Sequence, residues 1–91
     1  MSKYLVERHL PGITPDQLTA AAGAARNASA DMTREGVPVR YLRSTFIPGE
    51  ERCYCLFEGD SEESVKDANT RAGLPFDRIV PALHLAAEDL V

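Results

Sequence analysis

Four segments of the chain alternate apolar and polar residues with a period of two, which is typical of strands that have two different faces. The run R-C-Y-C-L-F-E-G, from Arg52 to Gly59, is partly apolar on both faces, so it is predicted to be a central strand. Pro81 lacks a backbone N–H donor, which places the last strand at an edge of the sheet. The predicted strands span residues 3–10, 37–47, 52–59 and 78–85.

Two other segments carry apolar residues at helical spacing between residues that start and stop helices. The first predicted helix follows the capping residue Thr14 and runs from Pro15 to about Glu35. Its apolar stripe is mostly alanine, so this helix can lie close to the sheet. The second begins after Asp60 or Ser61 and stops at Gly73.

The order strand, helix, strand, strand, helix, strand is the ferredoxin-like β-α-β-β-α-β pattern of the α+β class. We expect a single ferredoxin-like domain over residues 1–91. Its four-stranded sheet is predicted to be antiparallel, with the strand order 4-1-3-2. Right-handed crossovers put both helices on one face, and no segment remains to cover the other face.

The uncovered face is predicted to join two copies of the chain. Its alternating positions carry Glu7, His9, Glu58 and His84 among apolar residues. A monomer rarely leaves an apolar patch of this size in contact with water, so we expect a homodimer joined through the open sheet face. The alternative is a monomer that tolerates the patch. The apolar residues of this face are Leu5, Tyr54, Leu56, Val80 and Ala82.

Composition narrows the classes of partner. The chain has 91 residues, a net charge of −4, 44% hydrophobic residues and 26% charged residues. The negative charge argues against a nucleic acid or an anionic membrane as partner, because both attract basic surfaces. The N-terminus has no apolar signal region and no apolar run is long enough to span a membrane. We therefore expect a cytoplasmic protein with reduced cysteines.

The only two histidines are predicted to lie at opposite ends of neighbouring strands. His9 and His84 would then be roughly 15–17 Å apart at ~3.3 Å per residue, too far to hold one ion within one chain. Glu7 shares a face with His9, and Glu58 can approach His84 from across the first strand. For each histidine, the alternative is a surface or interface residue that only forms hydrogen bonds.

Cys53 and Cys55 place two thiols on one strand face, a pair that soft metals accept, but strong thiolate sites usually need more ligands or the spacing C-x-x-C. A disulfide between such neighbours would strain the strand. The alternative is two small hydrophobic residues packed under the helices. Arg40, Arg43 and Arg52 around the predicted hairpin fit either an anion site or a solvated rim.

Several known uses of this fold lack their motifs here. The third strand lacks the glycine and aromatic pattern of RNA-binding members, and no C-x-x-C follows the first strand, as it does in copper chaperones. The chain also has no phosphate-binding glycine loop and no zinc motif. No set of residues defines a reaction, so a binding protein is favoured over an enzyme.

Four segments resemble a family of small bacterial proteins that was first described as a domain of unknown function. One branch of that family is nickel-binding or nickel-responsive. The resemblance implies a ferredoxin-like fold, a homodimer joined through the sheets, and Ni²⁺ at the surface or the interface. The segments are V-E-R-H-L-P-G-I-T (6–14), C-Y-C-L-F-E-G (53–59), S-E-E-S-V (61–65) and A-G-L-P-F-D-R-I (72–79).

The nickel-binding branch is richer in histidine than this chain, which has Arg8 beside His9 and no histidine in its first helix. The leading hypothesis is a homodimer that binds Ni²⁺ through His9, Glu7, Glu58 and His84, since imidazole is a natural nickel ligand. By fold analogy, the alternative is a dimeric α+β-barrel protein that binds a small molecule, or a cofactor-free monooxygenase, isomerase or cyclase. A third hypothesis is a structural interaction module.

Overall fold

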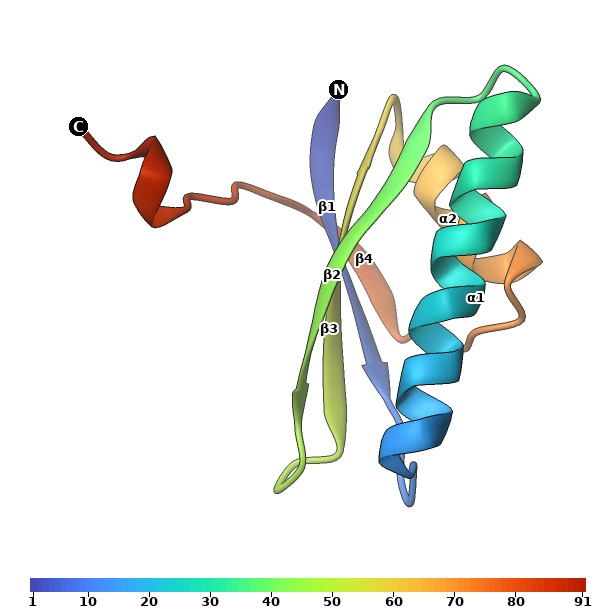
Figure 1. The fold of residues 1–91 in the computed structure, drawn as a ribbon, viewed down its shortest axis with the longest axis vertical. Coiled ribbons are helices and arrows are strands. Elements are labelled where there is room, and N and C mark those ends of the chain that lie inside the picture. Colours follow the sequence, from blue (N-terminus) through green and yellow to red (C-terminus); the bar gives the residue numbers. More distant parts are fainter.

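The computed structural model describes all residues from 1 to 91 and has two helices beside a four-stranded sheet (Figure 1). No helix has the length and apolar content that crossing a membrane requires. In chain order, the elements are β1 (Ser2–His9), α1 (Pro15–Arg34), β2 (Val39–Ile47), β3 (Arg52–Gly59), α2 (Glu62–Arg71), β4 (Arg78–Ala82) and the 3-10 helix η1 (Ala87–Asp89).

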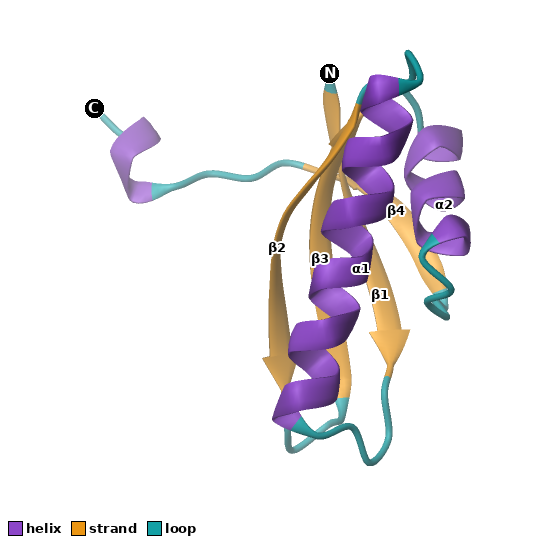
Figure 2. Ribbon diagram, turned by 45° about the vertical axis from the view of Figure 1, so that its right-hand side comes forward, coloured by secondary structure: helices purple, strands orange, loops and turns teal.

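All strand pairs are antiparallel, and the sheet order is β2-β3-β1-β4, which is the predicted order read from the other edge. The ferredoxin-like prediction is therefore confirmed, and β4 with Pro81 lies at an edge as expected. Figures 1 and 2 show α1 and α2 together on one side of the sheet. The chain after β4 leaves on the opposite side (Figure 1).

Local sequence fixes where both helices begin. Thr14 Oγ1 accepts from the Gln17 amide at 3.1 Å, and the Gln17 side chain accepts from the Thr14 amide at 2.9 Å, which closes a capping box. Of the two candidate caps for α2, the structure uses Ser61, whose hydroxyl accepts from the Ser64 amide at 3.2 Å. These contacts satisfy backbone donors that a helix leaves free at its start.

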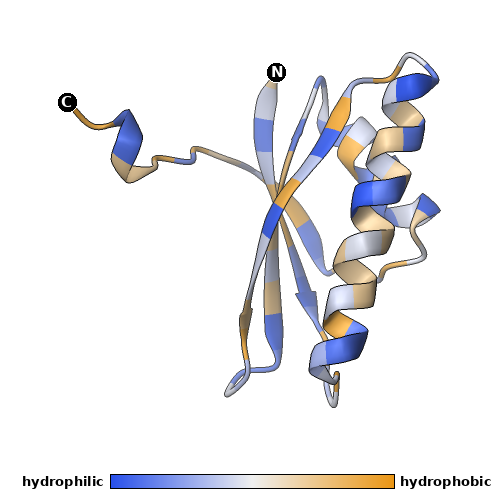
Figure 3. Ribbon diagram, in the orientation of Figure 1, coloured by the Kyte–Doolittle hydropathy of each residue, from blue (hydrophilic) through white to orange (hydrophobic).

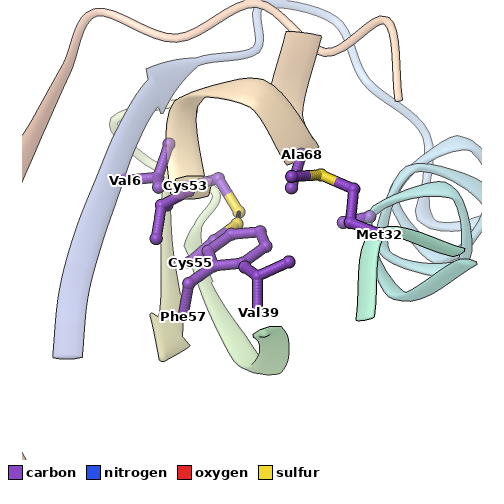
Figure 4. Packing of buried hydrophobic residues seen from close by; sticks show 9 residues of the cluster. Val6, Met32, Val39, Cys53, Cys55, Phe57 and Ala68 are labelled. Atoms are coloured by element: carbon purple, nitrogen blue, oxygen red, sulfur yellow. Dashed lines mark hydrogen bonds between the residues drawn. The ribbon is translucent and has the colours of Figure 1, made fainter. Parts of the chain in front are cut away.

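The core lies between the sheet and the helices and is centred on β3 (Figure 4). Phe57 is fully buried, and its ring meets Tyr41 edge to face at 5.5 Å between centroids. Ala25 and Ala68 bring the helices close to these rings, as the alanine stripe predicted. Figure 3 shows apolar and polar residues alternating along the strands. One face of each strand therefore packs into this core.

Two predicted strand boundaries were too generous. β4 ends at Ala82 rather than Leu85, because Ala82 pairs with Lys3 and β1 begins only one residue before that. β2 begins at Val39 rather than Val37, because the Val37 amide donates to Met32 O in the turn that ends α1. The alternation of apolar and polar residues in the sequence continues past the ends of both strands, but the backbone pairing of the sheet does not.

Two glycine-to-alanine changes should shift stability in opposite directions. A Cβ at Gly59 would lie 2.8 Å from Ser64 Oγ and 3.3 Å from a Val65 methyl. Since Ser64 Oγ also donates to Ser61 O, relief of this clash would disturb the cap of α2. Gly59→Ala should lower the free energy of unfolding by about 1–3 kcal/mol in urea titrations.

Gly23→Ala is the matched control, because no neighbouring heavy atom lies within 4 Å of a Cβ at that position of α1. Alanine favours a helix more than glycine does, so this change should raise the free energy of unfolding by about 0.5–1 kcal/mol. Equal effects of the two substitutions would contradict this account of the packing.

Candidate functional site

The face of the sheet that no helix covers has an apolar row across its centre and charged residues around it. Leu5 lies opposite Leu56 on β3 and Val80 on β4, so the three form this row. Neighbouring side chains cover much of it, and Leu56 is only 6% exposed. The apolar area is therefore smaller than alternation alone suggests.

A groove of about 190 Å³ lies on this face, between β2 and β3 on one side and the chain after β4 on the other. Tyr54 and Leu56 contribute apolar surface, while Arg43 and His84 contribute polar groups. The groove therefore combines an apolar wall with two nitrogen-bearing side chains. The remaining lining residues are Leu5, Thr45, Ala82 and Leu83.

Two of the predicted metal ligands are engaged in ion pairs. Arg78 Nε donates to Glu7 Oε2 at 2.7 Å from the neighbouring strand. Glu58 lies between Lys3 Nζ at 3.3 Å and Arg40 Nη1 at 3.7 Å. In both cases the cross-strand register puts a cation beside the carboxylate, which a metal ion would have to displace.

His84 is engaged as well. Arg43 Nη2 lies 2.8 Å from its Nδ1 and 3.1 Å from its Nε2. A neutral imidazole has one acceptor nitrogen, so the guanidinium donates to one of the two. This contact occupies the lone pair that a metal would need, and it ties the chain after β4 back to β2.

His9 differs from the other three candidates because its side chain is exposed and forms no hydrogen bond. It lies opposite Arg52 at the end of β1, far along the strand from the Ala82–Lys3 pair that precedes His84. An open hollow of about 580 Å³ adjoins it, lined also by Gln17 and Pro75. Its imidazole is thus available to a ligand from solvent.

Within one chain, no three of the histidine, cysteine and acidic side chains are arranged to hold a metal ion. Glu7, Glu58 and His84 have separate partners on the open face, and His9 has none. The assignment of these four residues as metal ligands therefore stays a prediction, and it requires a second chain or a rearrangement of the ion pairs.

The arginines near the β2–β3 hairpin do not converge either. Arg40 contacts Glu58, Arg43 contacts His84, and Arg52 donates to Asp77 at 3.0 Å. Three separate partners favour the solvated rim over a shared anion site.

The family of the chain follows from comparison with known proteins. A family model described as nickel responsive protein SCO4226-like matches residues 4–81. The chain belongs to this family. It is also similar to the crystal structure of SCO4226 from Streptomyces coelicolor A3(2), with 30% sequence identity and a TM-score of 0.76. That match covers 93% of this chain and 100% of the SCO4226 chain, and no curated protein matches.

The SCO4226-like chain has one surface feature that the sequence analysis missed, namely the segment after β4. Leu83 is 101% exposed and Leu85 is 72% exposed, and Leu90 near the C-terminus is also exposed. Figure 1 shows this segment, residues 83–91, projecting from the open side of the sheet as an arm. The sequence signal of this arm is the run L-H-L after Ala82, which the alternation of apolar and polar residues assigns to the last predicted strand.

Arg43→Ala should release the base of this arm. The substitution removes the contact between β2 and His84, which is worth about 0.5–1.5 kcal/mol if it behaves as an ordinary hydrogen bond. We expect lower heteronuclear NOE values for Leu83 and His84 in NMR relaxation measurements. Arg40→Ala is the control, because it removes a contact to Glu58 and leaves the arm untouched. Unchanged relaxation in Arg43→Ala would contradict the anchoring role.

Proposed function

We propose that this protein is a homodimer that binds Ni²⁺ on the open side of its sheet, with His9 as the first ligand. The observation that carries the proposal is the state of the four candidate ligands. His9 alone presents a free and exposed imidazole, whereas the other three side chains are already engaged. Membership of a nickel-responsive family supports Ni²⁺ as the metal.

The homodimer is supported by the arm and by the apolar row beside it. Leu83 and Leu85 present almost their whole side chains to water, which disfavours an isolated chain. A two-fold axis places the same patch of each copy against the other, so each arm would cross the partner's sheet. The Leu5, Leu56 and Val80 row offers such an arm an apolar surface.

Dimerisation also supplies what one chain lacks for metal binding. Nickel is usually held by several nitrogen or oxygen ligands, and a single chain offers only His9 without rearrangement. Ion pairs that are partly exposed contribute only about 0–1 kcal/mol, so a divalent ion can displace Arg78 from Glu7 or Lys3 from Glu58. Glu7, Glu58 and His84 are therefore the secondary ligands of the proposed site.

Binding of a small molecule in the open-face groove is the second candidate. Tyr54 and Leu56 form an apolar wall, and Arg43 and His84 supply polar groups that would orient a ligand. The volume of about 190 Å³ is below the roughly 300–1,000 Å³ of most ligand pockets. The small size of the groove in one chain favours nickel binding as the function of the protein. A partner arm that closes over the groove would enlarge the binding surface and favour a small ligand instead. The two free cysteines fit a reducing, cytoplasmic location.

Light scattering tests the dimer directly. The chain has a mass of 9.9 kDa, so the dimer should scatter as twice that value at micromolar concentration. The double substitution Leu83→Asp and Leu85→Asp should shift the mass to that of one chain, because it places charge where apolar contacts are expected. Leu90→Asp, at the far end of the arm, is a milder control. A wild-type mass of 9.9 kDa would end this proposal.

Titration with Ni²⁺ tests the site. His9→Ala should weaken nickel binding at least about tenfold, equivalent to ~1.4 kcal/mol, as measured by calorimetry and native mass spectrometry. Arg78→Ala should tighten it a few-fold, because Glu7 would no longer be shared with a guanidinium, and adding Glu7→Gln should remove that gain. Arg26→Ala on the outer surface of α1 is the matched control. Equal nickel affinity in wild type and His9→Ala would exclude His9 as a ligand.

A further inference from the structure

The helix-covered face of the sheet contains a buried positive charge with no carboxylate beside it. Arg8 is 2% exposed, and its guanidinium donates to Asn69 Oδ1 at 2.8 Å and to Pro75 O at 3.1 Å. Both acceptors are neutral, and Arg8 takes part in none of the six ion pairs of the structure. A buried cation is strongly destabilised unless its surroundings compensate its charge, and neutral acceptors do so only in part.

Two thiols lie near Arg8 on the helix-covered face. Arg8 lies opposite Cys53 in the strand register, and Cys53 and Cys55 share that face of β3. Their Sγ atoms are 3.6 Å apart, and both residues are buried. Figure 4 shows the two sulfur atoms next to each other beneath the helices.

The two thiols are coupled by the short contact between their sulfur atoms. A hydrogen bond from Cys53, together with the charge of Arg8, lowers the pKa of Cys55. The same hydrogen bond, together with burial, raises the pKa of Cys53. Arg8 is thus placed to stabilise negative charge on this pair of sulfur atoms.

A cavity adjoins the two thiols and is only large enough for one water molecule or one ion. Its volume is about 10 Å³, and its lining is mostly apolar but includes Arg8, Tyr41, Ser44, Cys53 and Cys55. That volume is close to the minimum that holds one water molecule, so an organic substrate does not fit. Ser44 Oγ lies 3.0 Å from Cys55 Sγ and 2.7 Å from the Tyr41 hydroxyl. The cavity is thus sized for one ion beside two sulfur atoms and one oxygen.

We infer that Cys53 and Cys55 form a binding site for one soft monovalent metal ion of the Cu⁺ class, with Arg8 as its counter-charge. Thiolate sulfur is the ligand that soft ions prefer. Sulfur atoms 3.6 Å apart can both lie within a metal–sulfur bond of ~2.3 Å, at an angle of roughly 100°. Ser44 Oγ is placed to make a third contact.

Charge balance selects a monovalent ion. When Cu⁺ binds, both sulfur atoms bind it as thiolates, and the thiol protons leave to solvent. The cluster then contains two thiolates, one Cu⁺ and one guanidinium, so its net charge is zero. Zn²⁺ or Ni²⁺ in the same place would leave one uncompensated positive charge in a buried site. The site lies on the opposite side of the sheet from His9 and does not depend on the proposed nickel site.

Anaerobic titration of the reduced wild-type protein with Cu⁺, in competition with bicinchoninate, tests this inference. We expect one Cu⁺ per chain, a thiolate-to-copper absorption band, release of protons on binding, and a higher melting temperature at one equivalent. Zn²⁺ and Ni²⁺ should fail to displace the bound Cu⁺. Failure of the wild-type protein to bind Cu⁺, a lower melting temperature, or displacement by equimolar Zn²⁺ would overturn the site.

Variants locate the ion. Cys53→Ser and Cys55→Ser should each weaken Cu⁺ binding at least about tenfold, whereas His9→Ala should leave it unchanged. Arg8→Met should weaken Cu⁺ binding about 10-fold to 100-fold and shift the preference toward Zn²⁺, because two thiolates then balance a divalent ion. Retention of full Cu⁺ affinity in Cys55→Ser would place the ion elsewhere. The wild-type competition between Cu⁺ and Zn²⁺ remains decisive if Arg8→Met does not fold.

Discussion

The packing of both helices against one face of the sheet is the constraint on which the rest of the structure depends. Phe57 and Val6 are fully buried because α1 and α2 cover them, and the alanines of both helices let that layer lie close. Right-handed crossovers then leave no helix for the other face. The sheet consequently has a dry side, where polar groups must find partners within the chain, and a wet side, where charged residues pair across strands.

On the wet side, the cross-strand register decides which side chains are free to bind. Arg78 lies opposite Glu7, Lys3 lies opposite Glu58, and each cation neutralises its carboxylate. Such exposed pairs are weak, so they restrain the carboxylates without removing them from chemistry. A divalent metal and a guanidinium compete for the same oxygen atoms. In the proposed nickel site, the affinity for metal would therefore depend on the arginines and lysines as much as on the ligands.

The fold was predictable from the sequence because it depends on periodicity, caps and turns, which are local signals. The two strand limits failed for a non-local reason, since β4 stops close to the point where β1 begins, at Ser2. The ligand arrangement was not predictable either. Alternation placed Glu7, His9 and His84 on the correct face, but the ion pairs depend on a register that no local pattern fixes. The burial of Arg8 was equally hidden, because an arginine in a strand normally signals solvent.

The two sides of the sheet offer metals different chemistry. The wet side presents imidazole and carboxylate groups, which suit a borderline divalent ion such as Ni²⁺, and its surplus cations must be displaced first. The dry side presents two sulfur atoms and a fixed guanidinium, which suit a soft monovalent ion. Burial makes the difference sharper, because an uncompensated charge is tolerated in water and strongly disfavoured under the helices. Charge balance, more than the number of ligands, therefore distinguishes the two proposed sites.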